Sequence, residues 1–333
     1  MKIIHFADVH LGMENYGKID SETGLNSRLG DFLNSFDVIV NTAIDKKVDL
    51  VIFAGDAYKT REPSPTYQRA FASKIYQIAS ANIPIAMLVG NHDFPNALGK
   101  ANTLDIYKTL NVPNIHMIGN NVNIIETKSG PIQIAGLPWF TKQQLLLKDD
   151  YNLPLEKMHQ KMSKMLSDKI MYLSSKIDSK IPSILLAHAT VEGSTFGSER
   201  SVMIGSDIIL PLKSLKNSRF SYIALGHLHK YQEILKVPPV IYSGSIERID
   251  FGEEKEDKGF VLINIDQSET ANFKTTWQFI KTPARRFLSV HSKISDIDEP
   301  TDKVINDIEK TNIKDAVVKL TIEISEEQQS ELS

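Results

Sequence analysis

The sequence predicts an α/β fold, a layered β-sandwich core flanked by helices with a small α+β unit behind it. Five short apolar runs are typical of buried strands, and each is followed at once by residues that can bind metal ions. Helical patterns separate the first three runs, which favours βαβ units and a largely parallel sheet. The five runs are residues 3–7, 50–54, 85–89, 184–186 and 223–225.

Amphipathic segments between these runs predict helices that cover the sheet, because their apolar residues recur at helical spacing. These segments are residues 28–46, 65–79 and 98–110. Residues 132–136 and 240–243 are further predicted strands. A second half-sheet that carries His188 and His227 would complete the sandwich.

Three later segments are predicted from local composition. Residues 155–177 space apolar side chains by three and four, which favours a helix over a methionine-rich partner groove. Residues 190–206 are rich in Gly, Ser and Thr, so we expect a loop after His188. Residues 253–258 mix both charges, so we expect a solvated turn.

A domain boundary is expected near Lys281, where a second, short strand–helix–strand pattern begins. We therefore predict a main domain over residues 1–281 and a small domain over residues 282–333. The elements predicted in the small domain are a strand at 287–290, a helix at 301–310 and a strand at 316–324.

The composition excludes some classes of function but does not identify the function. The net charge of −3 argues against a strongly cationic nucleic-acid-binding surface, although metal ions can supply local positive charge. The absence of cysteine excludes disulfides and thiolate metal sites. The N-terminus resembles neither a signal peptide nor a membrane span, so a cytoplasmic location with no membrane partner is expected.

The polar blocks behind the five runs predict a two-metal site. Carboxyl ends of strands gather site residues in α/β folds. Two divalent ions need several nitrogen or oxygen ligands and a shared carboxylate that holds them about 3.5–4 Å apart. Asp56 can bridge because it follows the second strand, and His227 and His229 can each reach a different ion. The predicted ligands are Asp8, His10, Asp56, Asn91, His188, His227 and His229.

This mixture of ligands favours phosphate-ester hydrolysis. Two divalent cations outweigh the carboxylates of Asp8 and Asp56, which leaves positive charge for a phosphate and a hydroxide. Nitrogen ligands beside oxygen ligands suit Mn²⁺, Fe²⁺ or Zn²⁺ more than Mg²⁺ or Ca²⁺. A lone Asp or His at a strand end is usually structural, but five blocks in a compatible order are not explained that way.

His92 is predicted to be catalytic and not a ligand. Its neighbour Asn91 is a ligand, so the His92 ring should face the substrate, where it could protonate the leaving oxygen or stabilise charge. Asp93 is predicted to orient it. Gly55, Gly90 and Gly226 would allow close backbone approach before the ligands. The four histidines outside the blocks are expected to be structural: His5, His116, His159 and His291.

These blocks resemble the calcineurin-like metallophosphoesterases, and the chain as a whole resembles the SbcD-type nuclease subunit of the double-strand-break repair complex. Three stretches narrow the resemblance. The opening stretch at 4–12 is similar to the start of that family. Residues 243–248 and 250–253 form a second similar block, and residues 282–286 lead into a unit like its DNA-binding capping domain.

The resemblance implies which residues share each ion. Asp8, His10, Asp56 and His229 would hold one metal, and Asp56, Asn91, His188 and His227 the other. It also implies manganese-dependent DNA exonuclease and endonuclease activity, a homodimer and an SbcC-type coiled-coil ATPase as partner. The helices after the second and third strands would form the dimer. Packing in the core of one chain explains their apolar residues equally well. These residues are Tyr67, Phe71, Leu104 and Tyr107.

Two departures from the family pattern limit this transfer. Some members have a histidine three residues after the bridging aspartate, where this chain has Lys59, which together with Arg61 either contacts phosphate or is solvated. Members also usually continue past the cap into a segment that docks on the ATPase. This sequence ends at Ser333, so we expect a shortened chain or a different mode of partner binding.

Two other functions are compatible with the sequence. A small-molecule phosphodiesterase, acting on a cyclic nucleotide or nucleotide sugar, could use the same metal blocks, and the negative net charge favours it. The small C-terminal unit favours the nuclease, because a minimal small-substrate enzyme needs no cap. A non-catalytic DNA or ATPase scaffold is disfavoured because every expected ligand position is filled.

Overall fold

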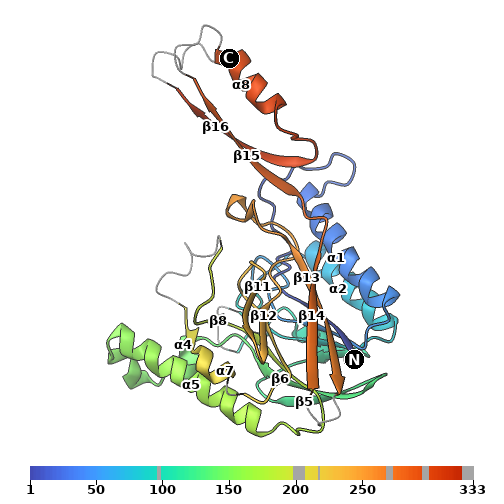
Figure 1. Ribbon diagram of the computed structural model, residues 1–333, viewed down its shortest axis with the longest axis vertical. Helices are drawn as coiled ribbons and strands as arrows, with labels where there is room; N and C mark the ends of the chain where they lie inside the picture. Colours follow the sequence, from blue (N-terminus) through green and yellow to red (C-terminus); the bar gives the residue numbers. More distant parts are fainter. Residues whose placement is uncertain (96–98, 198–206, 217, 268–272, 295–299, 325–333) are drawn as a thin grey trace.

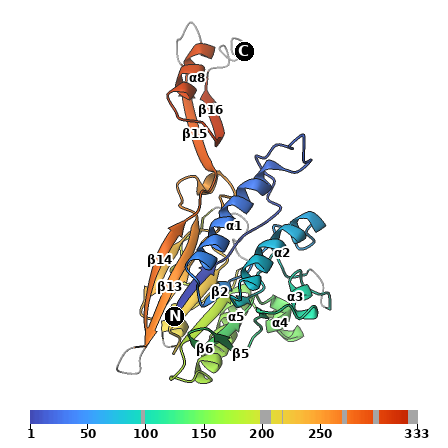
Figure 2. The ribbon, with the colours of Figure 1, turned by 90° about the vertical axis from the view of Figure 1, so that its right-hand side faces the viewer.

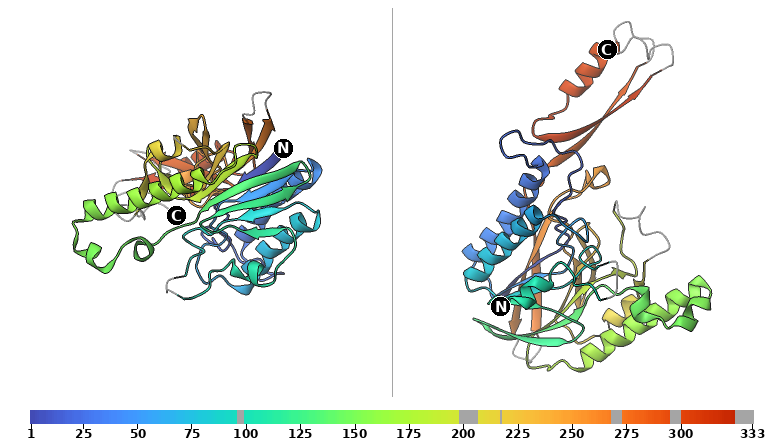
Figure 3. Two further views of the ribbon diagram at one scale, coloured as in Figure 1. Left: turned by 90° about the horizontal axis from the view of Figure 1, so that it is seen from below. Right: turned by 180° about the vertical axis from the view of Figure 1, so that it is seen from behind.

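Two six-stranded sheets stack face to face, and helices cover their outer faces (Figures 1 and 3). The computed structural model describes residues 1–95, 99–197, 207–216, 218–267, 273–294 and 300–324. The predicted α/β sandwich flanked by helices is confirmed.

The first sheet is parallel in its N-terminal half and antiparallel in the strands added later in the chain. Its order is β14-β13-β1-β2-β3-β4, with β1 to β4 parallel and β13 antiparallel to both β1 and β14. Its strands are β1 (Lys2–Phe6), β2 (Leu50–Phe53), β3 (Ile85–Met87), β4 (Ile115–Met117), β13 (Gly259–Gln267) and β14 (Phe273–Lys281).

The second sheet repeats this arrangement in the order β11-β12-β10-β7-β6-β5. Its four central strands are parallel, and β11 and β5 pair antiparallel at the edges. Its strands are β5 (Val122–Thr127), β6 (Gly130–Leu137), β7 (Ser183–His188), β10 (Tyr222–Gly226), β11 (Gln232–Lys236) and β12 (Pro239–Tyr242). Because the central strands of each sheet are parallel, their carboxyl ends reach one edge of the sandwich.

Helices α1 (Ser27–Asp45) and α2 (Pro65–Ser80) cover the first sheet (Figure 2). The Asn26 side chain caps α1 by accepting the N–H of Arg28. Aromatic rings join both helices to the strands: Phe36 packs on Phe6 with centroids 5.4 Å apart, and Phe71 packs on Phe53 at 5.5 Å. These helices agree with the predicted segments.

The predicted helix at 98–110 is mostly wrong. The structure has only α3 (Asp105–Thr109) there, while residue 98 lies outside the described part of the chain. Side chains that bond the backbone explain the late start: Asn102 accepts the N–H of Leu104, and Asp105 accepts the N–H of Asn102. Such local bonds compete with helical ones.

The second sheet is covered on its outer side by α5 (Leu155–Ser175), with the shorter α4 (Lys142–Leu145) and α7 (Leu212–Lys216) beside it (Figure 3). Helix α5 matches its prediction and buries one stripe against the sheet. The loop predicted at 190–206 begins instead with β8 (Thr190–Val191), which pairs with β9 (Ile209–Leu210). Residues 198–206 lie outside the described chain.

The residues suggested for a dimer contact belong mostly to the core of one chain. Phe71 and Leu104 are fully buried and Tyr107 is nearly so. Tyr67 is half-buried and its hydroxyl donates to Glu14. Core packing therefore explains Phe71 and Leu104, and it accounts for most of the Tyr107 side chain, which also lines an apolar groove.

The C-terminal elements form a separate layer at one end of the molecule (Figure 1). Strands β15 (Arg286–Lys293) and β16 (Ala316–Glu323) pair in parallel, and α8 (Pro300–Glu309) packs against β15. Ion pairing of Arg285 with Asp31 and an edge-to-face contact of Phe287 with Phe251, with centroids 5.0 Å apart, attach this unit to the main domain. In the described part of the chain, no helix has the length and apolar character needed to cross a membrane.

His5 lies between the two sheets as a neutral core residue. Its ring contacts the Tyr222 hydroxyl through Nδ1 at 3.1 Å and the Leu225 carbonyl oxygen through Nε2 at 3.2 Å. Burial lowers its pKa from 6.5 to about 3. Near pH 6 the His5 side chain therefore binds a proton in the unfolded chain but stays neutral in the folded chain.

We expect the free energy of unfolding to fall as the pH drops from 6.5 toward 3, with His5 contributing up to about 1.4 kcal/mol per pH unit. His5→Gln should flatten this slope, because an amide can bond both partners without titrating. Urea unfolding at several pH values measures it. The exposed His291→Gln is the control and should keep the wild-type slope; an unchanged slope in His5→Gln would contradict the assignment.

Candidate metal centre

Both sheets deliver polar side chains to one edge of the sandwich. Three short loops leave the ends of β1, β2 and β3, and two more positions come from the ends of β7 and β10. Imidazole and carboxylate atoms from these positions form groups in which all ligand atoms lie within 4.8 Å of one another. The residues brought together are Asp8, His10, Asp56, Asn91, His92, His188, His227 and His229.

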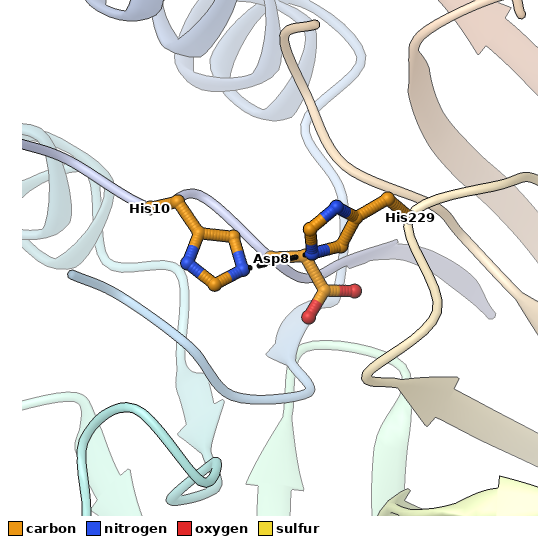
Figure 4. A group of neighbouring side chains, drawn as sticks. All are labelled: Asp8, His10 and His229. Carbon is orange, nitrogen blue, oxygen red and sulfur yellow. Dashed lines mark hydrogen bonds between the residues drawn. The ribbon is translucent and has the colours of Figure 1, made fainter. Parts of the chain in front are cut away.

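One group consists of Asp8, His10 and His229, all buried (Figure 4). The Nε2 atoms of His10 and His229 face each other 3.0 Å apart. Two imidazole nitrogens and a carboxylate oxygen at this spacing are a donor set that a divalent transition ion accepts. These residues reach the group from opposite sheets, since Asp8 and His10 follow β1 and His229 follows β10.

The second group surrounds Asp56 and Asn91. Asp56 Oδ2 lies 3.4 Å from His188 Nε2 and 3.6 Å from His10 Nε2, so one carboxylate oxygen lies between the two groups. Asn91 Oδ1 lies 2.9 Å from His188 Nε2 and 3.0 Å from His227 Nδ1. The seven side chains predicted as ligands therefore lie together, and Asp56 occupies the shared position expected of a bridge.

The backbone is strained at four of these residues. Asp8, His10, Asp56 and His227 have φ of 52°, 49°, 61° and 102°, a region that non-glycine residues rarely adopt. Strain of this kind costs about 1–3 kcal/mol per residue and persists where the surrounding structure enforces it. Four of the ten non-glycine residues with positive φ in the described chain lie at this edge of the sandwich, and all four are candidate ligands, which supports a functional role for the edge.

Glycines allow the strand ends to approach this closely. A Cβ atom on Gly90 would lie 2.1 Å from Asp56 Oδ1 and 2.5 Å from Asp56 N. One on Gly55, whose φ is +97°, would lie 2.6 Å from His188 Nδ1. The close backbone approach that the sequence predicts at both positions is confirmed.

The prediction that Asp93 orients His92 is wrong. Asp93 is fully buried, and its Oδ2 accepts the N–H groups of Asp56 at 2.8 Å and Gly90 at 3.0 Å, while Oδ1 accepts that of Ala57 at 2.9 Å. The carboxylate therefore joins the loops after β2 and β3. The ring of its chain neighbour His92 instead contacts the Lys59 carbonyl oxygen.

His92 is held by backbone groups. Its ring Nδ1 lies 2.8 Å from the Lys59 carbonyl oxygen, and its own N–H donates to Asp56 Oδ1 at 2.8 Å. Since a carbonyl can only accept, Nδ1 carries a proton and Nε2 is left available toward the site. Burial lowers the pKa of His92, with the Asp56 carboxylate acting in the opposite direction. The ring is half-buried beside His10, with centroids 4.9 Å apart.

The electrostatics of the site suit positive ions. Burial raises the pKa of Asp8 to about 6, because a buried carboxylate loses its hydration. Burial also opposes ionisation of Asp56, but the neighbouring His188 holds the pKa of Asp56 well below its usual range. The ion-pair partners of Asp56 among the described residues are histidines, not lysine or arginine. Divalent cations would satisfy both carboxylates, so the residues fit a two-metal centre.

Three residues at the site were not found from the sequence. Glu253 lies 2.9 Å from His229 Nδ1, Asp207 Oδ2 lies 3.0 Å from His227 Nε2, and the Trp139 ring lies 5.0 Å from that of His227. The turn predicted at 253–258 is present, with Lys255 and Asp257 exposed, but it is not solvated throughout, because Glu253 and Lys258 at its ends are buried as an ion pair. Neither Asp207 nor Trp139 follows a recognisable motif; Glu253 lies in a block that the family resemblance had marked.

The chain belongs to the calcineurin-like phosphoesterases, since the family described as Calcineurin-like phosphoesterase matches residues 1–231. This membership and the site geometry define it as a metal-dependent phosphoesterase, as the sequence predicted.

Within this family the chain is similar to the SbcD component of the SbcCD nuclease from two bacteria. It is 28% identical to that of Staphylococcus epidermidis over 313 residues, covering 92% of this chain and 76% of that protein. It is 26% identical to that of Bacillus subtilis, covering 84% and 68%. It is also 25% identical to the DNA double-strand break repair protein Mre11 of Methanosarcina mazei, covering 97% of this chain and 45% of that protein. The predicted resemblance to SbcD-type nucleases is confirmed at this level of similarity.

Gly90→Ala should disrupt the site, because the added methyl group would overlap the Asp56 carboxylate and backbone. We expect Mn²⁺ affinity to fall at least about 10-fold and stability to fall by about 1–3 kcal/mol, the cost of overpacking. Calorimetric titration and thermal unfolding measure the two effects. Gly30→Ala, on an open part of α1, is the control. Wild-type affinity in Gly90→Ala would show that the loops can separate freely.

Proposed function

We propose that this protein is a manganese-dependent DNA nuclease with exonuclease and endonuclease activity, which acts in double-strand-break repair with an SbcC-type ATPase. The observation that carries the proposal is the convergence of seven ligand-type side chains and His92 in a chain similar to SbcD-type nucleases. The cytoplasmic location stays a prediction of the sequence.

Each ion would have its own set of side chains. Asp8, His10 and His229 would hold one ion, and Asn91, His188 and His227 the other, with Asp56 shared. Such a pair of divalent cations supplies a nucleophile at neutral pH and neutralises phosphate charge. Imidazole ligands beside carboxylates favour Mn²⁺, Fe²⁺ or Zn²⁺ over Mg²⁺, and manganese is the choice that the family resemblance supports.

His92 would act on the substrate. Because its Nδ1–H bonds the Lys59 carbonyl, its Nε2 can meet a phosphate oxygen or the leaving oxygen. A bound phosphate anion favours the protonated ring, which reverses the effect of burial on the pKa of His92. The charged ring could then stabilise the transition state and protonate the leaving oxygen. Asp93 would contribute indirectly, by holding the loops that carry Asp56 and Asn91.

The C-terminal unit would contact DNA. Arg286 and Lys319 are exposed on its two paired strands, where they could contact phosphate groups. The net charge of −3 means that the phosphate-binding charge must be local, at this unit and at the metal ions. This requirement agrees with a cap that guides duplex DNA toward the metal edge.

His92→Ala should abolish cleavage of end-labelled duplex DNA in Mn²⁺, with a loss of about 100-fold or more, the usual contribution of a general acid. Two-ion Mn²⁺ binding should persist, because His92 is not assigned as a ligand. A small phosphodiester assayed in parallel tests the other candidate function, a small-molecule phosphodiesterase. Turnover of the small ester with no action on DNA would favour that function, and full DNA cleavage by His92→Ala would remove His92 from the mechanism.

A homodimer is proposed through the outer edge of α2 and α3. Tyr76, Ile106 and Leu110 are 64%, 54% and 67% exposed and line one apolar groove. Exposed apolar clusters of this kind favour association. Of the residues suggested from the sequence, Tyr107 lines the same groove, whereas Phe71 and Leu104 are buried in the core.

Ile106→Asp combined with Leu110→Asp should convert a dimer to a monomer, because burying two carboxylates in an apolar contact is unfavourable. Light scattering after size-exclusion chromatography measures the mass. Leu147→Asp, at a position 74% exposed elsewhere, is the control and should leave the mass unchanged. A wild-type monomer at all accessible concentrations would refute the dimer.

A further inference from the structure

We propose that Glu253 is a positioning residue that sets the tautomer and orientation of His229, and so controls the affinity of the metal ion that His229 would bind. The inference rests on the proposed two-metal function. Its basis is geometric: the His229 ring lies between two partners, with Nε2 facing His10 at 3.0 Å and Nδ1 2.9 Å from Glu253 Oε1. An ionised carboxylate can only accept, so Nδ1 must carry a proton, and in the neutral ring Nε2 then keeps its lone pair for an ion.

The structure holds Glu253 rigidly in the interior. Its Oε2 accepts the N–H of Ile249 at 2.8 Å and lies 2.9 Å from Lys258 Nζ. Lys258 Nζ also donates to the His229 carbonyl oxygen at 3.0 Å, so the same lysine contacts both ends of the pair. Glu253 is fully buried and Lys258 is 1% exposed. Glu253 therefore cannot turn away to solvent.

Burying the charges of Glu253 and Lys258 costs hydration energy, and a contribution to folding stability does not by itself explain why the pair is buried. Replacing a buried ion pair by apolar residues is often neutral or stabilising, so such a pair is weak evidence for a purely structural role. A carboxylate behind a metal-binding histidine, in contrast, fixes the ring and raises its basicity. Glu253 does this for His229 from a segment that follows β12, far from the ligand blocks in the sequence.

Glu253→Gln distinguishes a purely structural role of Glu253 from a role in positioning His229. The reason is that the amide has one acceptor end and one donor end. Two donors, Ile249 N–H and Lys258 Nζ, converge where Oε2 now lies, so the amide oxygen should occupy that position. The amide NH₂ then faces His229 Nδ1 and favours the tautomer with its proton on Nε2. That tautomer cannot bind an ion through Nε2.

We expect Glu253→Gln to bind one of its two Mn²⁺ ions about 10–100-fold more weakly in calorimetric titration, while the other ion is held nearly as in the wild type. In metal-free protein at pH 8, ¹⁵N-NMR of the imidazoles should show the His229 proton on Nδ1 in the wild type and on Nε2 in the variant, with His229→Gln giving the assignment. Glu256→Gln is the matched control. Glu256 lies 2.9 Å from Lys258 Nζ but is not bonded to the His229 ring, so its loss perturbs the lysine alone.

Wild-type Mn²⁺ affinity and an unchanged tautomer in Glu253→Gln would overturn the inference, as would equal effects in Glu256→Gln. If Glu253→Gln does not fold, Glu253→Gln with Lys258→Met removes both charges of the pair and keeps the test. The wild-type spectrum needs no variant: a proton on His229 Nε2 would itself refute the role. A wild type that binds no Mn²⁺ would refute the proposed function instead, while the tautomer would still report on Glu253.

Discussion

The structure depends on keeping two carboxylates, Asp8 and Asp56, buried at the edge of a β-sandwich. A buried anion loses hydration and must recover that energy from hydrogen bonds or opposite charge. Asp8 recovers part of it from the His227 N–H, which lies 3.0 and 3.1 Å from its two oxygens. Asp56 recovers part from the His92 N–H and from His188. The remainder is what divalent cations would provide.

The surrounding backbone is shaped by this requirement. Asp93 ties the loops after β2 and β3 together with three hydrogen bonds, and Gly90 leaves the space that Asp56 fills. Asp8 and Asp56 both adopt positive φ angles at these strand ends. Strain and tight loops therefore hold the candidate ligands in place without an ion, as a preorganised site requires.

One segment after β12 connects the site to the C-terminal unit. Glu247 accepts the N–H of Arg285 at 2.9 and 3.1 Å, and Glu254 accepts both the N–H and the hydroxyl of Ser289, at 2.9 and 2.7 Å. Between these two contacts the same segment presents Glu253 to His229. Attachment of the small unit and support of a candidate ligand thus depend on a few neighbouring residues.

Local sequence determined the fold class and the candidate ligands, because strands, amphipathic helices and Asp/His blocks leave short-range patterns. Asp8, Asp56 and His188 could be recognised because each lies at the end of an apolar strand or within three residues beyond it. Only the tertiary structure decided the partners that lie far apart in the chain. Glu253 meets His229 across 24 residues and Asp93 meets Asp56 across 37. No local pattern distinguishes a buried, paired charge from a solvated one, since burial depends on how both sheets pack together.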